Sequence, residues 1–163
     1  MLKIKSSKLF LQLKRSIKPY QSKIKAKETL ISGENNSIHN TMSKYNLENF
    51  NQIINSSYEW SDDEVDEKKL EDFEMCIDKY FDLYAPEDKK FREFIKIISI
   101  YLTFIAKKPL HPPGILFSNG ATVYQSEDSY HCTGKSVFIT ENHSLCKYCI
   151  CKWESVLKGV LPL

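Results

Sequence analysis

One apolar segment, FIKIISIYLTFIA from Phe94 to Ala106, constrains the fold more than any other part of the sequence. A helix that crosses a lipid bilayer needs about 20 predominantly apolar residues. This segment is shorter, and Lys96, Ser99 and Thr103 interrupt it. We therefore expect no membrane-spanning helix and no membrane contact, and we expect the segment to be buried inside the protein instead.

The same segment predicts the centre of a helical body. Pro86 suits the first position of a helix, where its missing N–H would have no helical partner, and Pro109 predicts that the helix stops at about Lys107. Between these limits, Phe94–Ala106 is apolar on nearly every face. A helix without a polar face is normally surrounded by other helices.

Four further segments carry apolar residues at helical spacing. They are residues 7–17, 21–30 and 45–55, and the segment that follows SDDE at Ser61–Glu64. SDDE matches a capping box, and its acidic residues suit the N-terminal end of the helix dipole. In contrast, residues 32–41 are rich in Ser, Asn and Gly, which predicts a loop that exposes His39.

Cys76 lies within the predicted helix after SDDE. The neighbouring apolar residues Phe73, Ile77, Tyr80 and Phe81 follow helical spacing, which is typical of a core face. A thiol in such a stripe normally acts as a small buried hydrophobic group. We expect Cys76 to be buried, remote from the other cysteines and without a catalytic role.

The pattern changes after Pro109. An Asn-Gly turn at Asn119-Gly120, flanked by alternating residues, predicts β-hairpins from Ile115 towards Cys132. A final helix is expected over 144–157. The fold class is therefore mainly α: a helical body of four to five helices over residues 1–108, with a Cys/His-rich hairpin-helix cap over 109–163 that packs on the body as one compact unit.

Four of the five cysteines lie in the last 32 residues. Cys146 and Cys149 have the Cys-x2-Cys spacing that lets two thiolates bind one tetrahedral ion, and Cys132 lies at the end of the predicted hairpins. A pair of cysteines at a helix start with a third in a β turn is common in small zinc modules. The sequence therefore predicts a metal centre with Cys132, Cys146 and Cys149 as ligands, and zinc as the metal.

Three residues are candidates for the fourth ligand. His111 begins the rigid turn HPPG and is the first choice, and His143, three residues before Cys146, is the second. Cys151 is the third choice, because on a helix it would face away from Cys149. His131 should point to the opposite side of its strand from Cys132.

Other interpretations of the thiols remain open. They could be free cysteines, or a redox Cys-x2-Cys pair, although that pair normally sits in a βαβ fold. An iron–sulfur cluster is the alternative cofactor, and it would normally need four cysteines, including Cys151. The N-terminus lacks the continuous apolar core of a signal peptide. We therefore expect a cytoplasmic protein, in whose reducing environment clustered cysteines favour metal over disulfide.

The charged segments say little about partners. Residues 1–27 carry nine Lys or Arg and no acid, which makes nucleic-acid binding through Lys3–Lys27 an alternative. Lysine outnumbers arginine 21 to 2, however, whereas phosphate and base readers usually exploit the arginine guanidinium. We favour a protein partner and a structural zinc site.

The chain has no obvious catalytic signature. It lacks HExxH, a phosphate-binding glycine loop and a Ser-His-Asp pattern. A catalytic zinc would need an open coordination position and a general base, for which Glu127, Asp128 and Glu141 are candidates. A metal-dependent enzyme is thus the alternative to a structural metal protein.

The segment HPPGILFSNGATVY, followed in the chain by YHCTGKSVFITENHSLCKYC, covers roughly the last third of the sequence. It resembles the C-terminal part of an uncharacterised archaeal family known mainly from methanogens, domain of unknown function 2115. That family has a helical body, a His-Pro-x-Gly turn, a Tyr-x-Cys or Tyr-Tyr-Cys segment with a nearby lysine, and a Leu-Cys-x-aromatic-Cys ending. The matching positions here are His111, Pro112, Gly114, Cys132, Lys135, Leu145, Cys146, Tyr148 and Cys149.

The resemblance implies no substrate, because the family has no established activity. Two residues depart from its pattern: Thr133 stands where the family usually has proline, and Cys151 is an extra cysteine. The three-cysteine pattern is intact. The anaerobic hosts of the family also make an iron–sulfur cluster a reasonable alternative to zinc.

Overall fold

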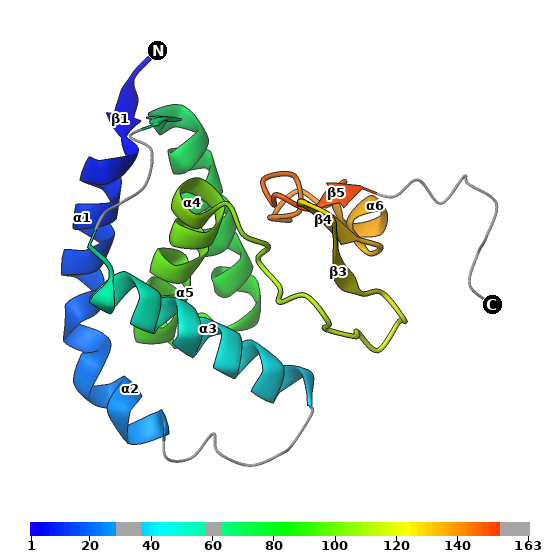
Figure 1. Cartoon of the computed structure of the whole chain (residues 1–163), viewed down its shortest axis with the longest axis horizontal. Coiled ribbons are helices and arrows are strands. Elements are labelled where there is room, and N and C mark those ends of the chain that lie inside the picture. The colour runs from blue at the N-terminus through cyan, green and yellow to red at the C-terminus, as the bar shows by residue number, and fades with distance from the viewer. Residues whose placement is uncertain (29–36, 58–62, 154–163) are drawn as a thin grey trace.

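The computed structural model describes residues 1–28, 37–57 and 63–153, and this part of the chain is mainly helical with a few short strands. Helices α1–α5 form one body, and strands β3–β5 with α6 form a smaller cap beside it (Figure 1). None of the helices in the described ranges has the length and apolarity to span a bilayer.

The helices are α1 (Ser6–Ile17), α2 (Gln21–Glu28), α3 (Ile38–Asn55), α4 (Glu67–Tyr84), α5 (Lys89–Ile100) and α6 (Lys135–Phe138), with a 3-10 turn η1 (Lys18–Tyr20) and a π-helical segment η2 (Tyr101–Ala106). The strands are β1 (Lys3–Lys5), β2 (Glu64–Asp66), β3 (Val123–Ser126), β4 (Ser129–Cys132) and β5 (Lys152–Trp153). β1 and β2 pair antiparallel. In the second sheet, β4 pairs antiparallel with β3 and parallel with β5.

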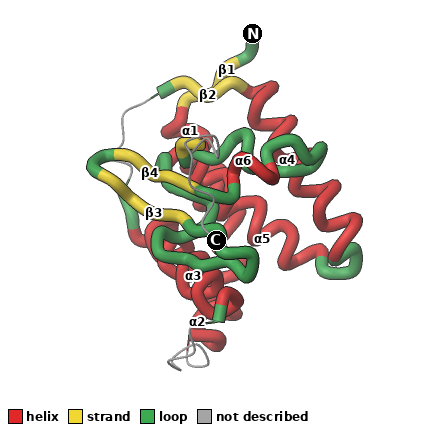
Figure 2. The backbone as a smooth tube through the Cα atoms, turned by 90° about the vertical axis from the view of Figure 1, so that its right-hand side faces the viewer, coloured by secondary structure: helices red, strands yellow, loops and turns green. Residues whose placement is uncertain are grey.

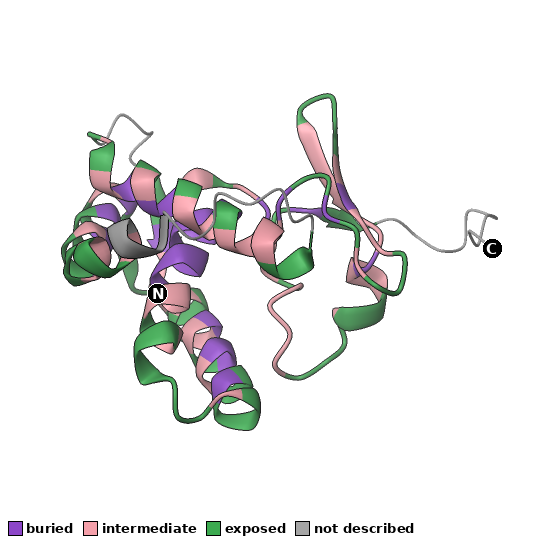
Figure 3. Cartoon of the chain, turned by 90° about the horizontal axis from the view of Figure 1, so that it is seen from below, coloured by how far each residue is buried: buried purple, intermediate pink, exposed green. Residues whose placement is uncertain are grey.

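The predicted central helix is confirmed. It consists of α5 continued by η2, and together these two segments contact α1, α3 and α4. Tyr101 is fully buried on η2, and Phe10 of α1 packs against its ring. Each of these helices carries buried residues, and Figure 3 colours the chain by burial. Lys107, in the left-handed region at φ 52°, ends the π-helical segment before Pro109.

The predicted start of the helix after SDDE is wrong. Glu64, the last residue of the expected capping box, lies instead in β2, where Val65 pairs with Ile4 of β1 and is buried. Ser61 lies outside the described residues. The N-cap residue of helix α4 is Asp66, whose carboxylate accepts hydrogen bonds from two backbone N–H groups of the first turn. Figure 2 shows the β1–β2 pair at one end of the body.

The third and fifth helices also differ from the sequence prediction at their starts. α5 begins at Lys89, because the Asp88 side chain accepts a hydrogen bond from the Phe91 N–H, and Pro86 lies in the preceding turn. α3 begins at Ile38 behind a Ser37 cap, so His39 is helical rather than in a loop. The predicted loop residues 32–36 and the end of the second helix, residues 29 and 30, lie outside the described ranges.

The hairpins of the cap are confirmed. Leu116 bridges Thr122 around the Asn119-Gly120 turn, where Gly120 takes φ 85°, and the β3–β4 hairpin follows directly. The predicted helix over 144–157 is wrong: residues 144–151 form turns, and residues 154–157 lie outside the described part. The chain forms β5 there because it pairs with β4, placing Trp153 opposite Cys132.

The cap packs on the body through a few specific contacts. Leu145 and Tyr148 pack against the main core, and the Tyr148 ring meets Phe73 of α4 edge-on at 5.2 Å between ring centroids. The Tyr45 hydroxyl of α3 donates a hydrogen bond of 2.7 Å to the carbonyl oxygen of Pro109. These contacts position the cysteine-rich turns over α4 and α3.

Candidate metal centre

A cavity of about 830 Å³ lies between the helical body and the cap. One side comes from α3, α4 and α5 and the other from the cap, and most of the lining is apolar. The four residues predicted as metal ligands, His111, Cys132, Cys146 and Cys149, all line it. The structure therefore brings together, around one cavity, residues that are up to 38 positions apart in the sequence.

Two of the thiols, Cys149 and Cys151, are in direct contact. Their side chains share a hydrogen bond, which lowers the pKa of Cys149 to about 6 and raises the pKa of Cys151. Backbone N–H groups of Leu110 and Cys151 and the charge of Lys135 favour the Cys149 thiolate further, and burial opposes them. Within this pair, the thiolate form is therefore favoured on Cys149, with the Cys151 thiol as its hydrogen-bond donor.

Cys146 and Cys132 complete the thiol group. Burial raises the pKa of Cys146, the nearby Cys149 and Cys132 raise it further, and a hydrogen bond with the Ser144 side chain works in the opposite direction. The Ser144 hydroxyl also accepts a 3.1 Å hydrogen bond from the Cys146 N–H. Cys132 therefore influences the charge state of Cys146 across the cavity.

Lys135 holds the turn that carries Cys149 and Cys151. Its ammonium group, at the start of α6, donates hydrogen bonds of 2.8 Å to the carbonyl oxygen of Cys149 and 2.7 Å to that of Cys151. Its charge also lowers the pKa of Cys146 and Cys149. Hydrogen bonds from a charged donor are stronger than neutral ones. Lys135 thus fixes the backbone and favours negative charge on the sulfurs.

The expected orientation of Cys151 is wrong. The expectation assumed a helix, in which Cys151 would face away from Cys149, but this segment is a series of turns. Cys151 is only 2% exposed, lines the same cavity as Cys149 and shares a hydrogen bond with it.

The histidines have different surroundings. His111 packs its ring at 90° against Phe117, with 5.0 Å between centroids, and burial lowers its pKa, so its imidazole stays neutral at pH 7. His143 also lines the cavity. The ring of His131 stacks on that of Tyr124 at 5.0 Å.

The remaining candidate residues lie in different parts of the structure. Cys76 is buried on α4, as expected, and its neighbour on the cap side is Tyr148. Glu127 and Asp128 form the turn between β3 and β4, whereas Glu141 lines the cavity. Within residues 1–28, 37–57 and 63–153, no group of three or more His, Cys, Asp or Glu side chains has a metal-binding arrangement. The cysteines therefore gather around the cavity without a complete coordination geometry.

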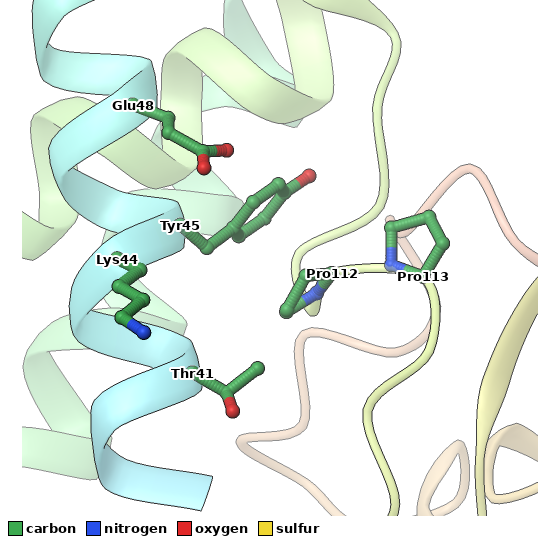
Figure 4. Close-up of a pocket in the computed structure, with 6 residues that line it drawn as sticks. All are labelled: Thr41, Lys44, Tyr45, Glu48, Pro112 and Pro113. Carbon is green, nitrogen blue, oxygen red and sulfur yellow. The ribbon is translucent and has the colours of Figure 1, made fainter. Parts of the chain in front are cut away.

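Sequence analysis missed Tyr45. A second hollow of about 340 Å³ lies between α3 and the proline turn after His111. Figure 4 shows Tyr45 extending from α3 towards Pro112 and Pro113. Its buried hydroxyl, whose pKa burial raises, holds the Pro109 carbonyl and so fixes the start of the His111 turn. No sequence signal links Tyr45 to a partner 64 residues away.

Comparison with known proteins assigns the chain to a family. The model of an uncharacterised protein family conserved in archaea, DUF2115, matches residues 5–154. The chain belongs to this family. It is similar to the UPF0305 protein MJ0646 of Methanocaldococcus jannaschii, with 38% identity over 72% of this chain and 71% of the relative. A UPF0305 protein of Methanothermobacter thermautotrophicus is 32% identical over 53% of each chain. No solved structure matches.

Family membership confirms the resemblance seen in the sequence. The matched region covers the helical body as well as the cysteine-rich cap, since it runs from Lys5 to Glu154. The names of these relatives state no activity, substrate or metal.

Proposed function

We propose that this DUF2115 protein binds one tetrahedral zinc ion through the thiolates of Cys132, Cys146 and Cys149, and that the ion stabilises the cap on the helical body. One observation carries the proposal: these three cysteines, from a strand end and two turns, line one cavity together with the sequence-based candidate for the fourth ligand, His111. Zinc takes thiolate and imidazole ligands in closed structural sites of this kind.

The sulfurs have the surroundings that metal ligands need. Metal-bound cysteine is a thiolate, and positive charge with N–H donors nearby favours that form. Lys135 and the backbone N–H groups of Leu110 and Cys151 supply both to Cys149. Binding would require the ligand side chains to move closer together, since no three of them have a metal-binding arrangement in the described residues. Such coupling between metal binding and local folding is common in small metal sites.

The role that we propose for the metal-bound protein is recognition of another protein in the cytoplasm. Exposed apolar side chains on α4 support this part: Leu83 is 60% exposed, and Tyr84 68%. Contiguous exposed apolar groups often mark protein interfaces. A Leu83→Glu/Tyr84→Glu variant should lose co-purifying protein and keep its metal.

Nucleic-acid binding has less support. Lys3 lies 2.8 Å and Lys5 3.9 Å from carboxylate oxygens of Glu64, and the Lys14 ammonium donates to the Ser56 carbonyl. These contacts occupy part of the positive charge of the N-terminal segment. If binding through Lys3–Lys27 nevertheless occurred, its affinity should fall steeply with salt concentration.

Metal analysis of anaerobically purified protein tests the main proposal. We expect about one zinc per chain in the unmodified protein and loss of that zinc in each of Cys132→Ser, Cys146→Ser and Cys149→Ser. Cys76→Ser is the matched control, because Cys76 is buried in the body and does not line the cavity. Full zinc content in any of the first three variants would contradict the proposed ligands. Iron with sulfide in place of zinc would identify an iron–sulfur protein.

A further inference from the structure

Cys151 occupies a position that suits a metal ligand better than a packing residue. It belongs to a small buried cluster with Ile115 and Val123. A thiol in such a cluster would normally be a simple hydrophobic group. Here, however, two other thiols, Cys132 and Cys149, pack against the same cluster, and Cys151 lines the cavity with them.

The backbone around Cys151 brings it to the other sulfurs. β5 begins directly after Cys151 and pairs in parallel with β4, so that Trp153 lies opposite Cys132. The chain that leaves Cys151 therefore runs beside Cys132. On its other side, Cys151 shares a side-chain hydrogen bond with Cys149. Cys151 thus adjoins the strand that carries Cys132 and contacts the side chain of Cys149.

The turn from Cys149 to Cys151 is held in a shape that presents both sulfurs. Lys135 binds the carbonyl oxygens of both residues, at 2.8 and 2.7 Å. The backbone N–H groups of Cys151 and Leu110 donate to the Cys149 sulfur. Hydrogen bonds around ligating atoms orient metal ligands and tune their charge. This network is present for Cys151, which the sequence placed last among the candidates.

His111 contributes to the site in a different way. Its ring packs edge-on against Phe117. The preceding residue, Leu110, contacts the thiols instead. Its backbone N–H donates a hydrogen bond to the Cys149 sulfur. The imidazole therefore acts as part of the cavity wall, and the turn itself supplies a hydrogen bond to the thiolate.

From these contacts we propose that Cys151 is the fourth ligand, so that four thiolates, from Cys132, Cys146, Cys149 and Cys151, hold the ion. This proposal rests on the zinc site proposed above and replaces His111 at its fourth position. Zinc with four thiolates has a net charge of −2, and Lys135 is the one lysine or arginine among the described residues that line the cavity. Its position at the Cys149–Cys151 turn offsets part of that charge.

Four protein thiolates would close the coordination shell. A catalytic zinc keeps one position open for water or substrate, whereas a site with four protein ligands is typical of structural zinc. The proposal therefore predicts a structural metal and no zinc-bound water. It also predicts a site in which softer donors exclude oxygen-seeking ions such as Mg²⁺.

X-ray absorption spectroscopy of the zinc-loaded unmodified chain tests the proposal without any substitution. We expect four sulfur ligands near 2.3 Å and no nitrogen ligand. Three sulfurs and one nitrogen would overturn the assignment of Cys151 and leave the zinc site itself intact. Absence of bound zinc would overturn the zinc site as well, so the two failures are distinguishable.

Paired variants give a second, independent result. Cys151→Ser should lower zinc affinity at least tenfold, whereas His111→Ala should keep one zinc per chain with affinity changed less than threefold. Cys76→Ser, at another buried thiol, controls for the loss of a buried sulfur as such. Zinc retained in Cys151→Ser and lost in His111→Ala would overturn the proposal. If Cys151→Ser does not fold, the sulfur count from the unmodified chain decides.

Discussion

Phe73 connects the helical body to the cap, and a double-mutant cycle can measure that connection. The ring is fully buried on α4 and meets two other rings edge-on. The distances between centroids are 5.3 Å to Phe104 of η2 and 5.2 Å to Tyr148 of the cap. Phe73→Leu removes the aromatic contacts and keeps an apolar side chain in the core.

The size of the effect follows from these contacts. An edge-to-face aromatic pair contributes about 0.5–1.5 kcal/mol beyond the burial of its area. Phe73→Leu loses two pairs, so it should lower the free energy of unfolding by about 1–3 kcal/mol. Tyr148→Leu loses one pair, about 0.5–1.5 kcal/mol. Because both substitutions remove the same contact, the double variant should be less destabilised than their sum by about 0.5–1.5 kcal/mol.

Urea unfolding followed by helical circular dichroism measures all four proteins of the cycle, each in the same metal state. The control combines Phe73→Leu with Tyr84→Leu. Tyr84 lies on the same helix, is 68% exposed and packs on Tyr80 instead. That pair should be additive. Additivity of Phe73→Leu and Tyr148→Leu, or equal coupling in the control pair, would refute the packing of the cap against α4.

Three further substitutions test single contacts by urea or thermal unfolding. Asp66→Ala removes the N-terminal capping side chain of helix α4 and should lower the free energy of unfolding by about 0.5–2 kcal/mol. An unchanged unfolding midpoint would contradict the assignment of Asp66 as the N-cap. Burial raises the pKa of the Glu74 carboxyl above 4.5, so the folded state favours its neutral form. The stability that the neutral carboxyl contributes is present below about pH 4.5 and is lost as the pH rises through the folded pKa. Glu74→Gln should therefore stabilise the chain at pH 7 and have little effect at pH 4. A larger stabilisation at pH 4 than at pH 7 would contradict this prediction. Lys135→Met removes two charge-assisted hydrogen bonds of about 1.5–3 kcal/mol each, so it should lower the free energy of unfolding by about 3–6 kcal/mol, and an unchanged value would contradict this.

Periodicity predicted the helices of the body because their apolar residues face a shared interior. Leu9 and Phe10 of α1 and Phe73 and Ile77 of α4 are all buried, as their spacing required. The starts of α4 and α5 were missed for local reasons. β1 pairs with β2 across about 60 residues and removes Glu64 from the helix, and Asp88 competes with Pro86 as the cap of α5.

The cysteine-rich part shows a different limit. Composition and spacing identified Cys132, Cys146 and Cys149 as a group, and all three line one cavity. The position of Cys151 was misjudged because a helix was expected, whereas pairing of β5 with β4 draws the chain into turns. The anchoring of Pro109 by Tyr45 depends on a contact over 64 residues, and no local pattern encodes it.

Hydrogen–deuterium exchange of the metal-loaded and chelated protein tests the central claim most directly, since that claim is that a zinc ion bound by the cysteines stabilises the cap. Structural zinc contributes about 10 kcal/mol or more in small modules. We predict that chelation accelerates amide exchange throughout residues 109–153, and that amides in α1, α4 and α5 remain protected. Identical exchange in residues 109–153 with and without chelator would contradict the account, because the cap would then hold its structure without a metal ion.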